Sequence, residues 1–376
     1  MFVVLVFALS AAAILYILFL YPAVVIIMAR LRPNPVRRAP LEKRVTVVMA
    51  VHNGARFLRA KLDSLLALNY PRELTDVIAV SDGSTDETDA IAREYEDRGV
   101  RLIRVPKGGK PAALNAGIAA ADGEILLFTD VRQELDRGAL RYLLENFADE
   151  RVGCCSGRLV IRKGASLEEE NVGLYWRYEF AIRNALASLD SIFGATGALY
   201  AMRRELAGPI PADALNDDMH LPLLAFFRGR RLAVDDRARI YDYPIGLESE
   251  FRRKVRTLAG NYQIVREFPA LLGPANRMWI HYVSYKFGRL LLPLFLLATL
   301  VSGVFLPAPF DWIATAGQLA FYLAAACDPW LPRPLKKLSS PVRIFTVMML
   351  ATLAASSILF RPASSFWKET KVREAV

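Results

Sequence analysis

Long apolar runs occupy the two ends of this chain, and short apolar segments fill its middle. Residues 1–29 contain no charged side chain, and a helix of that length crosses a bilayer core at about 1.5 Å per residue. Residues 290–310, 312–327 and 344–360 are also uncharged, although the last two are short for complete spans. The pattern predicts a membrane helix at 1–29 and a C-terminal membrane region at 286–361 with two or three spans.

The middle of the chain, residues 45–245, has the pattern of an α/β domain. Short runs rich in β-branched residues alternate with segments of helical period such as 55–68. This alternation predicts an open, mostly parallel sheet with helices on both faces. Ser84 and Glu87 fit a capping box for a helix that ends at Gly99. The predicted strands are 45–51, 76–80, 101–105 and 124–130.

Basic residues flank the apolar runs. The linker 30–44 carries six of them against Glu42 alone, and the loop 328–343 carries four against Asp328. By the positive-inside rule both segments lie in the cytoplasm, and so does the middle of the chain. We therefore assign the net charge of +10 to an anionic membrane surface and not to nucleic acid. The predicted location is the cell membrane, crossed more than once. The side of the tail at 362–376 and the oligomeric state stay open.

Two other features narrow the protein class. The first apolar run lacks the basic start and the small-residue cleavage site of a secretory signal peptide, which favours a retained anchor. There are three cysteines: Cys154 and Cys155 are adjacent, and Cys327 falls in an apolar run. This arrangement supports neither a disulfide framework nor a zinc site.

Polar side chains follow each of the four predicted strands. His52 and Asn53 follow the first strand and Asp82 follows the second. Lys110 comes after the third strand and Asp130 ends the fourth. Because the carboxyl ends of parallel strands meet at one edge of a sheet, we expect these side chains in one cleft. Any one of them alone would be an ordinary solvated loop residue, but four consecutive strands that end this way predict a shared ligand site.

The cleft has the composition of a nucleoside-diphosphate site. Asp82 offers a carboxylate to the hydrogen-bond donors of a base or ribose. Segment 106–117 supplies glycines that let the backbone approach a ligand, lysines Lys107 and Lys110 to offset diphosphate charge, and Asn115 on the helix that follows. The segment is not a G-x-x-x-x-G-K-[ST] phosphate loop, so ATP hydrolysis is not predicted.

Two adjacent acids, Asp217 and Asp218, precede another helical stretch. Pro222 is tolerated in its first turn, and Gly229 suits its C-terminal cap. The helix dipole favours an acid at this position by about 0.3–1 kcal/mol, which explains one of the two acids without any chemistry. It does not explain the pair. A carboxylate that faces the cleft is suited to take a proton from an acceptor hydroxyl as a general base.

The order of these motifs resembles membrane-bound family 2 glycosyltransferases, whose α/β fold is called GT-A. The resemblance covers roughly residues 44–260 and extends to the membrane layout on both sides. It implies inverting transfer of a sugar from a UDP-sugar, with Mg²⁺ or Mn²⁺, to a membrane-proximal acceptor such as a lipid-linked saccharide. The motifs are HNG (52–54), SDGSTD (81–86), KGGKPAALNAG (107–117), FTD (128–130), GATGALYAMRREL (194–206) and NDDMHLP (216–222).

The same resemblance implies roles for individual residues. Asp218 lies eleven residues before Gly229 and matches the general base, with Asp217 in the position of a family glutamate. Asp130 matches the first acid of the family's D-x-D motif and is the implied metal ligand. The implied nucleotide-sugar contacts are His52, Asn53, Asp82, Lys110, Asn115, Asp130, Arg132 and Arg256, and the residues that border the acceptor are Gly194, Thr196 and Gly197.

The first departure from the family pattern is Arg132, which stands where D-x-D has its second acid. One explanation is that Asp130 holds the metal with help from Asp217 or His220. The other is that the Arg132 guanidinium neutralises charge on the diphosphate leaving group. A similar F-T-D-A-R-Q variant occurs in relatives that make exopolysaccharides, so the departure does not by itself indicate an inactive protein.

The second departure concerns the Q-x-x-R-W motif of processive synthases. The chain has Arg253 in place of Gln, keeps Arg256 and has Thr257 in place of Trp. Loss of the Trp removes a stacking platform for the acceptor sugar, which favours the addition of one sugar per acceptor. A processive synthase and a non-catalytic subunit that binds a nucleotide sugar or polysaccharide remain alternatives. Segment 246–285 is expected to form interfacial amphipathic helices, where Arg256 contacts either the diphosphate or lipid headgroups.

Overall fold

The computed structural model describes residues 1–161, 167–243 and 247–367. The chain divides into two compact units. The sheet unit consists of Ala29–Arg162 and Arg183–Tyr243, and the helical unit consists of Met1–Met28, Lys163–Ile182 and Pro244–Val376. The sheet unit therefore begins before the predicted domain at 45–245, and segment 163–182 belongs to the helical unit. The part of the predicted tail beyond 367 lies outside the described residues.

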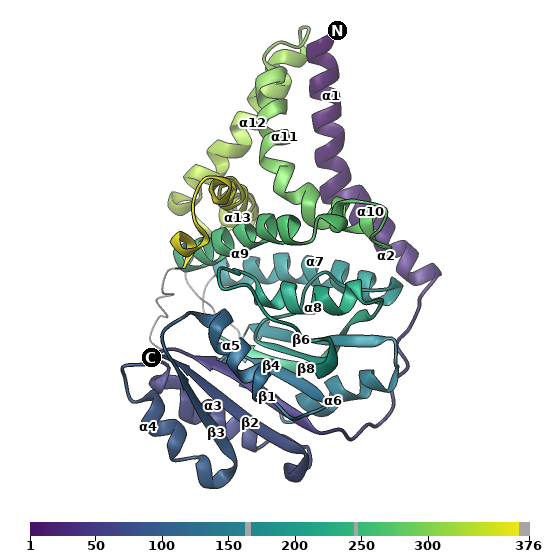
Figure 1. Cartoon of the computed structure of the whole chain (residues 1–376). Helices are drawn as coiled ribbons and strands as arrows, with labels where there is room; N and C mark the ends of the chain where they lie inside the picture. The colour runs from purple at the N-terminus through teal and green to yellow at the C-terminus, as the bar shows by residue number, and fades with distance from the viewer. Residues whose placement is uncertain (162–166, 244–246, 368–376) are drawn as a thin grey trace. The chain divides into compact units, whose positions relative to one another are not determined.

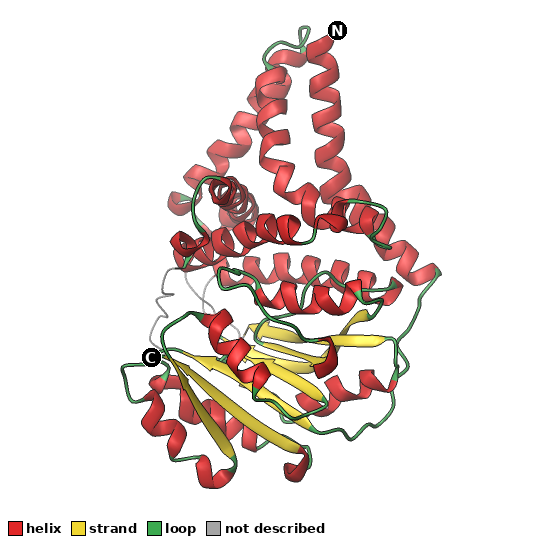
Figure 2. Cartoon of the chain, in the orientation of Figure 1, coloured by secondary structure: helices red, strands yellow, loops and turns green. Residues whose placement is uncertain are grey.

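The described part of the sheet unit contains one eight-stranded mixed sheet (Figure 2). The strand order is β3-β2-β1-β4-β7-β6-β8-β5. Strands β1 to β4 are parallel, and β6 is parallel to β8, whereas β7 and β5 run antiparallel to their neighbours. The prediction of a mostly parallel sheet is confirmed. The strands are β1 (Val45–Val51), β2 (Thr75–Asp82), β3 (Val100–Val105), β4 (Ile125–Thr129), β5 (Glu134–Leu135), β6 (Val152–Ile161), β7 (Leu199–Arg203) and β8 (Arg231–Asp242).

Helices cover both faces of this sheet, as the sequence predicted (Figure 1). On one face, Val47 and Met49 of β1 lie in a buried cluster with Leu58 and Leu62, which are one helical turn apart. On the other face, Gly117 lies so close to β1 that a Cβ there would approach Val48 Cγ1 to 2.5 Å. The first face carries α3 (Ala55–Leu66), α4 (Thr88–Arg93) and α6 (Ala139–Glu145), and the second carries α5 (Lys110–Ala119) and α8 (Asp217–Phe227).

The helix after β2 differs from its prediction. It begins at Thr88 and ends at Arg93, and the chain reaches Gly99 through a short 3₁₀ segment. The predicted capping box is wrong. The Asp86 carboxylate accepts the Thr88 backbone N–H at 3.0 Å, while the Ser84 hydroxyl accepts the backbone N–H of Asn53 at 3.2 Å. Ser84 therefore joins two loops and does not cap a helix.

Part of the basic linker packs onto the sheet unit. Arg38 Nε lies 3.6 Å from Asp235 Oδ2 and donates to Asn146 Oδ1 at 3.1 Å. The Arg37 backbone N–H donates to the Asp149 carboxylate at 3.2 Å. Arg38 therefore has partners within the sheet unit, while its side chain stays 44% exposed.

The helical unit contains three helices that are long and apolar enough to cross a membrane, judged by length and composition among the described residues. They are Phe2–Leu31, Trp279–Gly303 and Arg333–Leu359. The run 312–327, the second of the three predicted C-terminal stretches, forms α12 (Phe310–Cys327) and is not one of the three candidates. The run 344–360, for which the sequence left a full crossing open, falls almost entirely within the candidate Arg333–Leu359.

The first candidate span packs against the second. A Cβ built at Gly303 would lie 3.6 Å from Phe7 Cε2, and one at Gly288 would lie 3.2 Å from Ile17 Cδ1. The helices of this unit are α1 (Phe2–Leu15), a π-helical turn (Tyr16–Leu20), α2 (Tyr21–Leu31), α7 (Leu167–Leu189), α9 (Leu247–Glu267), α10 (Trp279–Tyr282), a π-helical turn (Val283–Phe287), α11 (Gly288–Gly303), α12 and α13 (Arg333–Ala355), with α2 and α7 ending in the sheet unit. The predicted amphipathic helix within 246–285 corresponds to α9.

Candidate active site

Loops at the carboxyl ends of β1 and β2 are bonded to each other. His52 Nδ1 lies 2.7 Å from the Asp82 carbonyl oxygen, so that nitrogen carries the proton and donates it. The Asn53 side-chain oxygen accepts the backbone N–H of Thr85 at 2.8 Å. Asn53 has a φ of 48°, a left-handed conformation that asparagine tolerates better than most residues. His52 and Asn53 thus fix the shape of the loop edge.

The Asp82 carboxylate organises the glycine segment that follows β3. Its Oδ1 accepts the backbone N–H of Gly108 at 2.7 Å, and its Oδ2 accepts that of Gly109 at 3.0 Å. Gly109 has a φ of 85°, which a residue with a Cβ rarely adopts. Asp82 stays a predicted nucleotide contact; in the structure its carboxylate binds the two backbone amides that precede Lys110.

Lys110 brings two carboxylates together at the start of α5. Its Nζ lies 3.0 Å from Asp130 Oδ1, at the end of β4, and 3.2 Å from Asp217 Oδ2, at the start of α8. Burial alone would lower the pKa of the Lys110 ammonium, but Asp130, Asp217 and Asp218 together raise that pKa above its ordinary value. The four side chains therefore form one electrostatic cluster.

The first turn of α8 places Asp218 against the segment predicted to border the acceptor. The Asp218 carbonyl accepts the backbone N–H of Ala195 at 2.7 Å. A Cβ built on Gly197 would come within 2.9 Å of Asp218 Oδ2, and one on Gly194 within 2.5 Å of Met219 Cγ. The two glycines allow this close contact. Gly229, with a φ of 81°, ends the helix as predicted.

Ser156 and Arg183 form hydrogen bonds that hold the segment 194–197 in place. The Thr196 backbone N–H donates to Ser156 Oγ at 2.8 Å, and Arg183 donates to the Thr196 hydroxyl at 3.3 Å and to Ser156 Oγ at 3.1 Å. Neither Ser156 nor Arg183 belongs to a recognisable motif, so sequence reasoning missed both. Tyr200 lies inside the motif 194–206 but was not singled out; it is fully buried, and burial together with nearby Asp217 raises the pKa of its hydroxyl well above the ordinary value.

Two predicted contact residues of the sheet unit have partners outside this cluster, and a third, Arg256, belongs to the other unit. The Asn115 side-chain amide donates to the Ile210 carbonyl at 2.8 Å and accepts the Ile210 N–H at 2.9 Å. Both polar atoms of the amide are therefore hydrogen-bonded to the backbone of Ile210. Arg132 pairs with Asp242 of β8 at 2.5 Å. Arg256 belongs to α9 in the helical unit, where its guanidinium lies 4.7 Å from the centre of the Trp367 ring.

The carboxylates around Lys110 suit a divalent cation in their donor chemistry. Asp130 and Asp217 present hard oxygen donors to one positive group. Mg²⁺ prefers such donors and is commonly held by one or two carboxylates together with substrate phosphates. Across residues 1–161, 167–243 and 247–367, no group of three or more His, Cys, Asp or Glu side chains is placed to hold a metal alone. His220, a candidate helper ligand, instead bonds the Pro209 carbonyl through Nε2 at 3.2 Å. The donors fit a cation that a diphosphate helps to hold.

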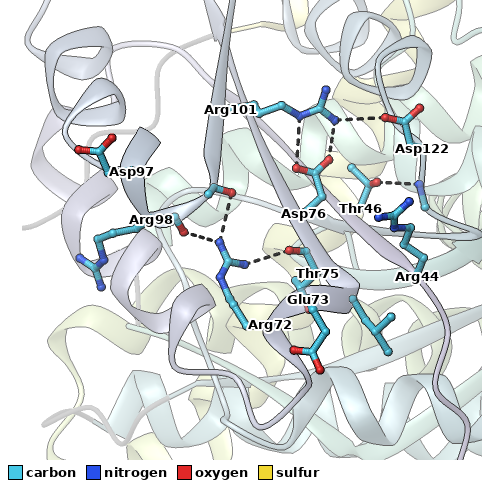
Figure 3. Close-up of a pocket in the computed structure, with 13 residues that line it drawn as sticks. Arg44, Thr46, Arg72, Glu73, Thr75, Asp76, Asp97, Arg98, Arg101 and Asp122 are labelled. Carbon is cyan, nitrogen blue, oxygen red and sulfur yellow. Dashed lines mark hydrogen bonds and ion pairs between the residues drawn. The ribbon is translucent and has the colours of Figure 1, made fainter.

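A separate cavity of about 950 Å³ lies at the amino ends of β1 to β3, away from these acids. Figure 3 shows Arg101 between Asp76, at 2.5 Å, and Asp122, at 3.9 Å. Arg72 donates to the Thr75 carbonyl at 3.0 Å. Arg101 and Arg72 are thus engaged with acids and carbonyls of the cavity itself, and none of the motif residues lines it.

The middle of the chain is similar to known glycosyltransferases. Residues 46–208 match the family model described as Glycosyl transferase family 2. A Bacillus subtilis protein described as "Probable glycosyltransferase YdaM" is 24% identical over 257 residues, which are 65% of this chain and 61% of that protein. The poly-beta-1,6-N-acetyl-D-glucosamine synthase of Staphylococcus aureus is 24% identical over 237 residues, 60% of this chain and 56% of that protein. The match spans about three fifths of the length of these relatives.

One solved structure shares the fold over nearly the whole chain. The mannosyltransferase PcManGT from Pyrobaculum calidifontis, in complex with GDP-Man and Mn²⁺, matches with a TM-score of 0.69 and 22% identity, over 93% of this chain and 99% of that one. This similarity shows the fold of the chain. The chain therefore has the GT-A fold, and its residues 46–208 are similar to glycosyl transferase family 2.

Proposed function

We propose that this protein transfers a sugar from a nucleoside-diphosphate sugar, of which a UDP-sugar is our first candidate, to a hydroxyl group with inversion at C1. The observation that carries the proposal is the contact of Lys110 with both Asp130 and Asp217, one residue from Asp218. A lysine held between carboxylates, at the sheet edge where Asp82 orders two glycine amides, suits a diphosphate with a leaving sugar.

The proposed reaction has a single displacement step. The Asp218 carboxylate takes the proton of the acceptor hydroxyl while the oxygen of that hydroxyl forms a bond to C1 of the sugar. The bond from C1 to the β-phosphate oxygen breaks, and its electron pair leaves with the nucleoside diphosphate. The Lys110 ammonium offsets the charge that develops on this leaving group. A divalent cation held by Asp130, with Asp217 beside it, would supply further positive charge to the same oxygens.

We propose a lipid-linked saccharide as the acceptor and the cytoplasmic face of the cell membrane as the location. Three candidate spans and the basic segments beside them support this assignment. The amphipathic α9 carries Arg252, Arg253, Lys254 and Arg256, as expected of a helix that meets anionic headgroups. Two of these arginines also have partners on the same helix, since Arg253 pairs with Glu250 at 2.6 Å and Arg252 pairs with Glu248.

One sugar per acceptor remains our first proposal because Thr257 replaces the tryptophan of Q-x-x-R-W. A processive synthase is the second candidate, and one contact favours it. The Trp367 ring, which is 38% exposed, lies against Arg256 and so supplies an aromatic face next to the retained arginine. The poly-N-acetylglucosamine synthase among the relatives points the same way.

The full chain in detergent or lipid nanodiscs, incubated with UDP- and GDP-sugars and Mg²⁺ or Mn²⁺, tests the proposal. Release of nucleoside diphosphate that depends on an added lipid-linked saccharide is the expected result. The length of the product then separates single addition from processive synthesis. If no donor releases nucleoside diphosphate yet UDP or GDP still binds, the protein is a non-catalytic nucleotide-binding subunit and the proposal fails.

Gly197→Ala is expected to lower the transfer rate roughly 10- to 100-fold, because misplacing a reacting group by about 1 Å has effects of that size. The added Cβ would lie 2.9 Å from Asp218 Oδ2 and 3.4 Å from its Cβ, so the carboxylate has to turn away. Nucleoside-diphosphate affinity, measured by calorimetry, should stay unchanged. Gly273→Ala is the control, since a Cβ there would meet nothing within 4 Å. A wild-type rate for Gly197→Ala would show that the Asp218 carboxylate does not act from this position.

A further inference from the structure

We propose that Lys61 and Asp242 are positioning residues that clamp the turn after Asp130 from two sides and so set the place of the Asp130 carboxylate. The inference rests on the proposed function, because it assigns Asp130 to the diphosphate site. It also assigns Arg132 to the clamp, as the partner of Asp242, and not to contact with the leaving group. We refer to the turn at 130–133 as the DVRQ turn.

Lys61 holds the DVRQ turn from the α3 side. It is 1% exposed, and its ammonium donates to Thr129 Oγ1 and to the Gln133 carbonyl, both at 2.7 Å. These two partners flank Asp130 on either side along the chain. Burying a charged group costs free energy that a methionine of similar length would avoid. A lysine at this position therefore serves the polar groups that it bonds, not the packing of the core.

Asp242 holds the same turn from β8. Its Oδ2 accepts Arg132 at 2.5 Å and the Gln133 side-chain amide at 3.0 Å, and its Oδ1 accepts the backbone N–H of Tyr243 at 2.9 Å. Asp242 is 3% exposed, so this pair is shielded from solvent. The arginine that replaces the second acid of D-x-D is thus tied to a carboxylate supplied by another strand.

Lys61 is also connected, through Thr129, to the segment that lies next to the proposed base Asp218. Thr129 Oγ1 accepts from Lys61 and donates its own proton to the Ala198 carbonyl at 2.8 Å. Ala198 follows Gly197, which lies against the Asp218 carboxylate. Hydrogen bonds in such a chain polarise and strengthen one another. Lys61 therefore fixes the spacing between the loop of Asp130 and the loop next to Asp218.

A positive charge on Lys61 is consistent with its proposed role in positioning the DVRQ turn. Burial lowers the pKa of Lys61 to about 7, while Asp130 and Glu134 act in the opposite direction. The positive end of the side chain is surrounded by oxygen atoms of Thr129 and Gln133, which favour its charged form. The geometry of these contacts, more than the titration, supports the assignment.

Lys61→Met tests the clamp, because methionine fills nearly the same space and removes both hydrogen bonds. We expect kcat to fall roughly 10- to 100-fold through misplacement of Asp130. The melting temperature should stay the same or rise, since replacing a buried charge by an apolar side chain is often neutral or stabilising. A purely structural lysine gives the opposite pattern: a lower melting temperature with a normal kcat for the folded protein.

Two further variants complete the experiment. Asp242→Asn should lower kcat, and the double variant with Lys61→Met should lose little more than the worse single variant, because both residues hold one turn. Lys61→Ala removes the alkylammonium part of the side chain and leaves a cavity of that shape. Its kcat should rise again when ethylammonium or propylammonium is added to fill the cavity. Lys43→Met is the matched control, because Lys43 pairs with Glu124 at 2.7 Å at the opposite ends of the strands.

The outcomes separate the two proposals. If the wild type transfers sugar and Lys61→Met does so at the same kcat, the clamp is refuted and the proposed function stands. If the wild type neither binds UDP or GDP nor turns over any donor, the proposed function is refuted and the clamp with it. A low kcat in Lys61→Met at an unchanged melting temperature, rescued in Lys61→Ala by the alkylamine, establishes the clamp.

Discussion

Asp218→Asn is expected to lower sugar transfer by roughly 10²- to 10⁴-fold, the range that a general base contributes. The amide keeps the shape of the side chain, so the contact with Gly197 and the backbone bond to Ala195 should remain. The substitution removes the basic carboxylate that accepts the proton of the acceptor hydroxyl. Affinity for UDP or GDP, measured by calorimetry, should be nearly unchanged because Lys110 keeps Asp130 and Asp217 as partners.

The pH dependence of this variant adds a second measurement. In the wild type, kcat/KM should fall on the acid side as the base becomes protonated, and that acid limb should be absent from the residual activity of Asp218→Asn. Asp97→Asn is a suitable control, since Asp97 is exposed and lines the cavity at the amino ends of the strands. Full activity in Asp218→Asn would remove Asp218 from the mechanism and leave Asp217 as the acid to examine.

The first half of the sheet could be predicted because its signals are local. Strand 45–51 coincides with β1, and the helical period at 55–68 coincides with α3 to within two residues. The polar residues at the strand ends were expected in one cleft from the geometry of parallel sheets alone. The contacts of Lys110 with Asp130 and Asp217 agree with that expectation.

The second half of the sheet was not predicted, and β8 shows why. The strand 231–242 contains six charged residues, and such a composition is typical of a solvated segment. Asp235 is nevertheless 1% exposed, because Arg237 and Arg38 pair with it at 2.7 Å and 3.6 Å. Buried charges that neutralise each other hide the alternation of apolar and polar positions on which strand prediction depends.

The supports of the site were missed for a related reason. Arg132 finds its partner Asp242 across 110 residues of sequence, and Lys61 finds Thr129 across 68. Spacing along the chain carries no signal for such pairs. Lys61 also falls in a helix where a lysine is ordinarily exposed, so the sequence offers no reason to place it in the core. A motif identifies the residues that touch a ligand more readily than those that hold them.

Lys110→Met is expected to lower sugar transfer at least about 100-fold, the size of effect seen when one charge-stabilising group is removed from a transition state. Without the ammonium, Asp130, Asp217 and Asp218 repel both each other and the incoming diphosphate. The free energy of unfolding should fall by about 2 kcal/mol, because Asp217, with a side chain only 8% exposed, loses a charged partner. Both effects are measurable, the first by nucleoside-diphosphate release and the second by urea unfolding of the variant beside the wild type.

The reason for expecting so large an effect is that Lys110 stays charged wherever the protein is active. Its pKa is raised above the ordinary value of 10.5, so the stabilisation it provides is fully present below that pH and is lost only at higher pH. The loss caused by Lys110→Met should therefore be the same at pH 6 and pH 9. Lys107→Met removes a positive charge from the same glycine segment, but no ion pair with Lys107 is found in the described structure, so its loss should be much smaller. Equal losses in the two variants would mean that only the net charge of the segment matters and that the contacts with Asp130 and Asp217 do not.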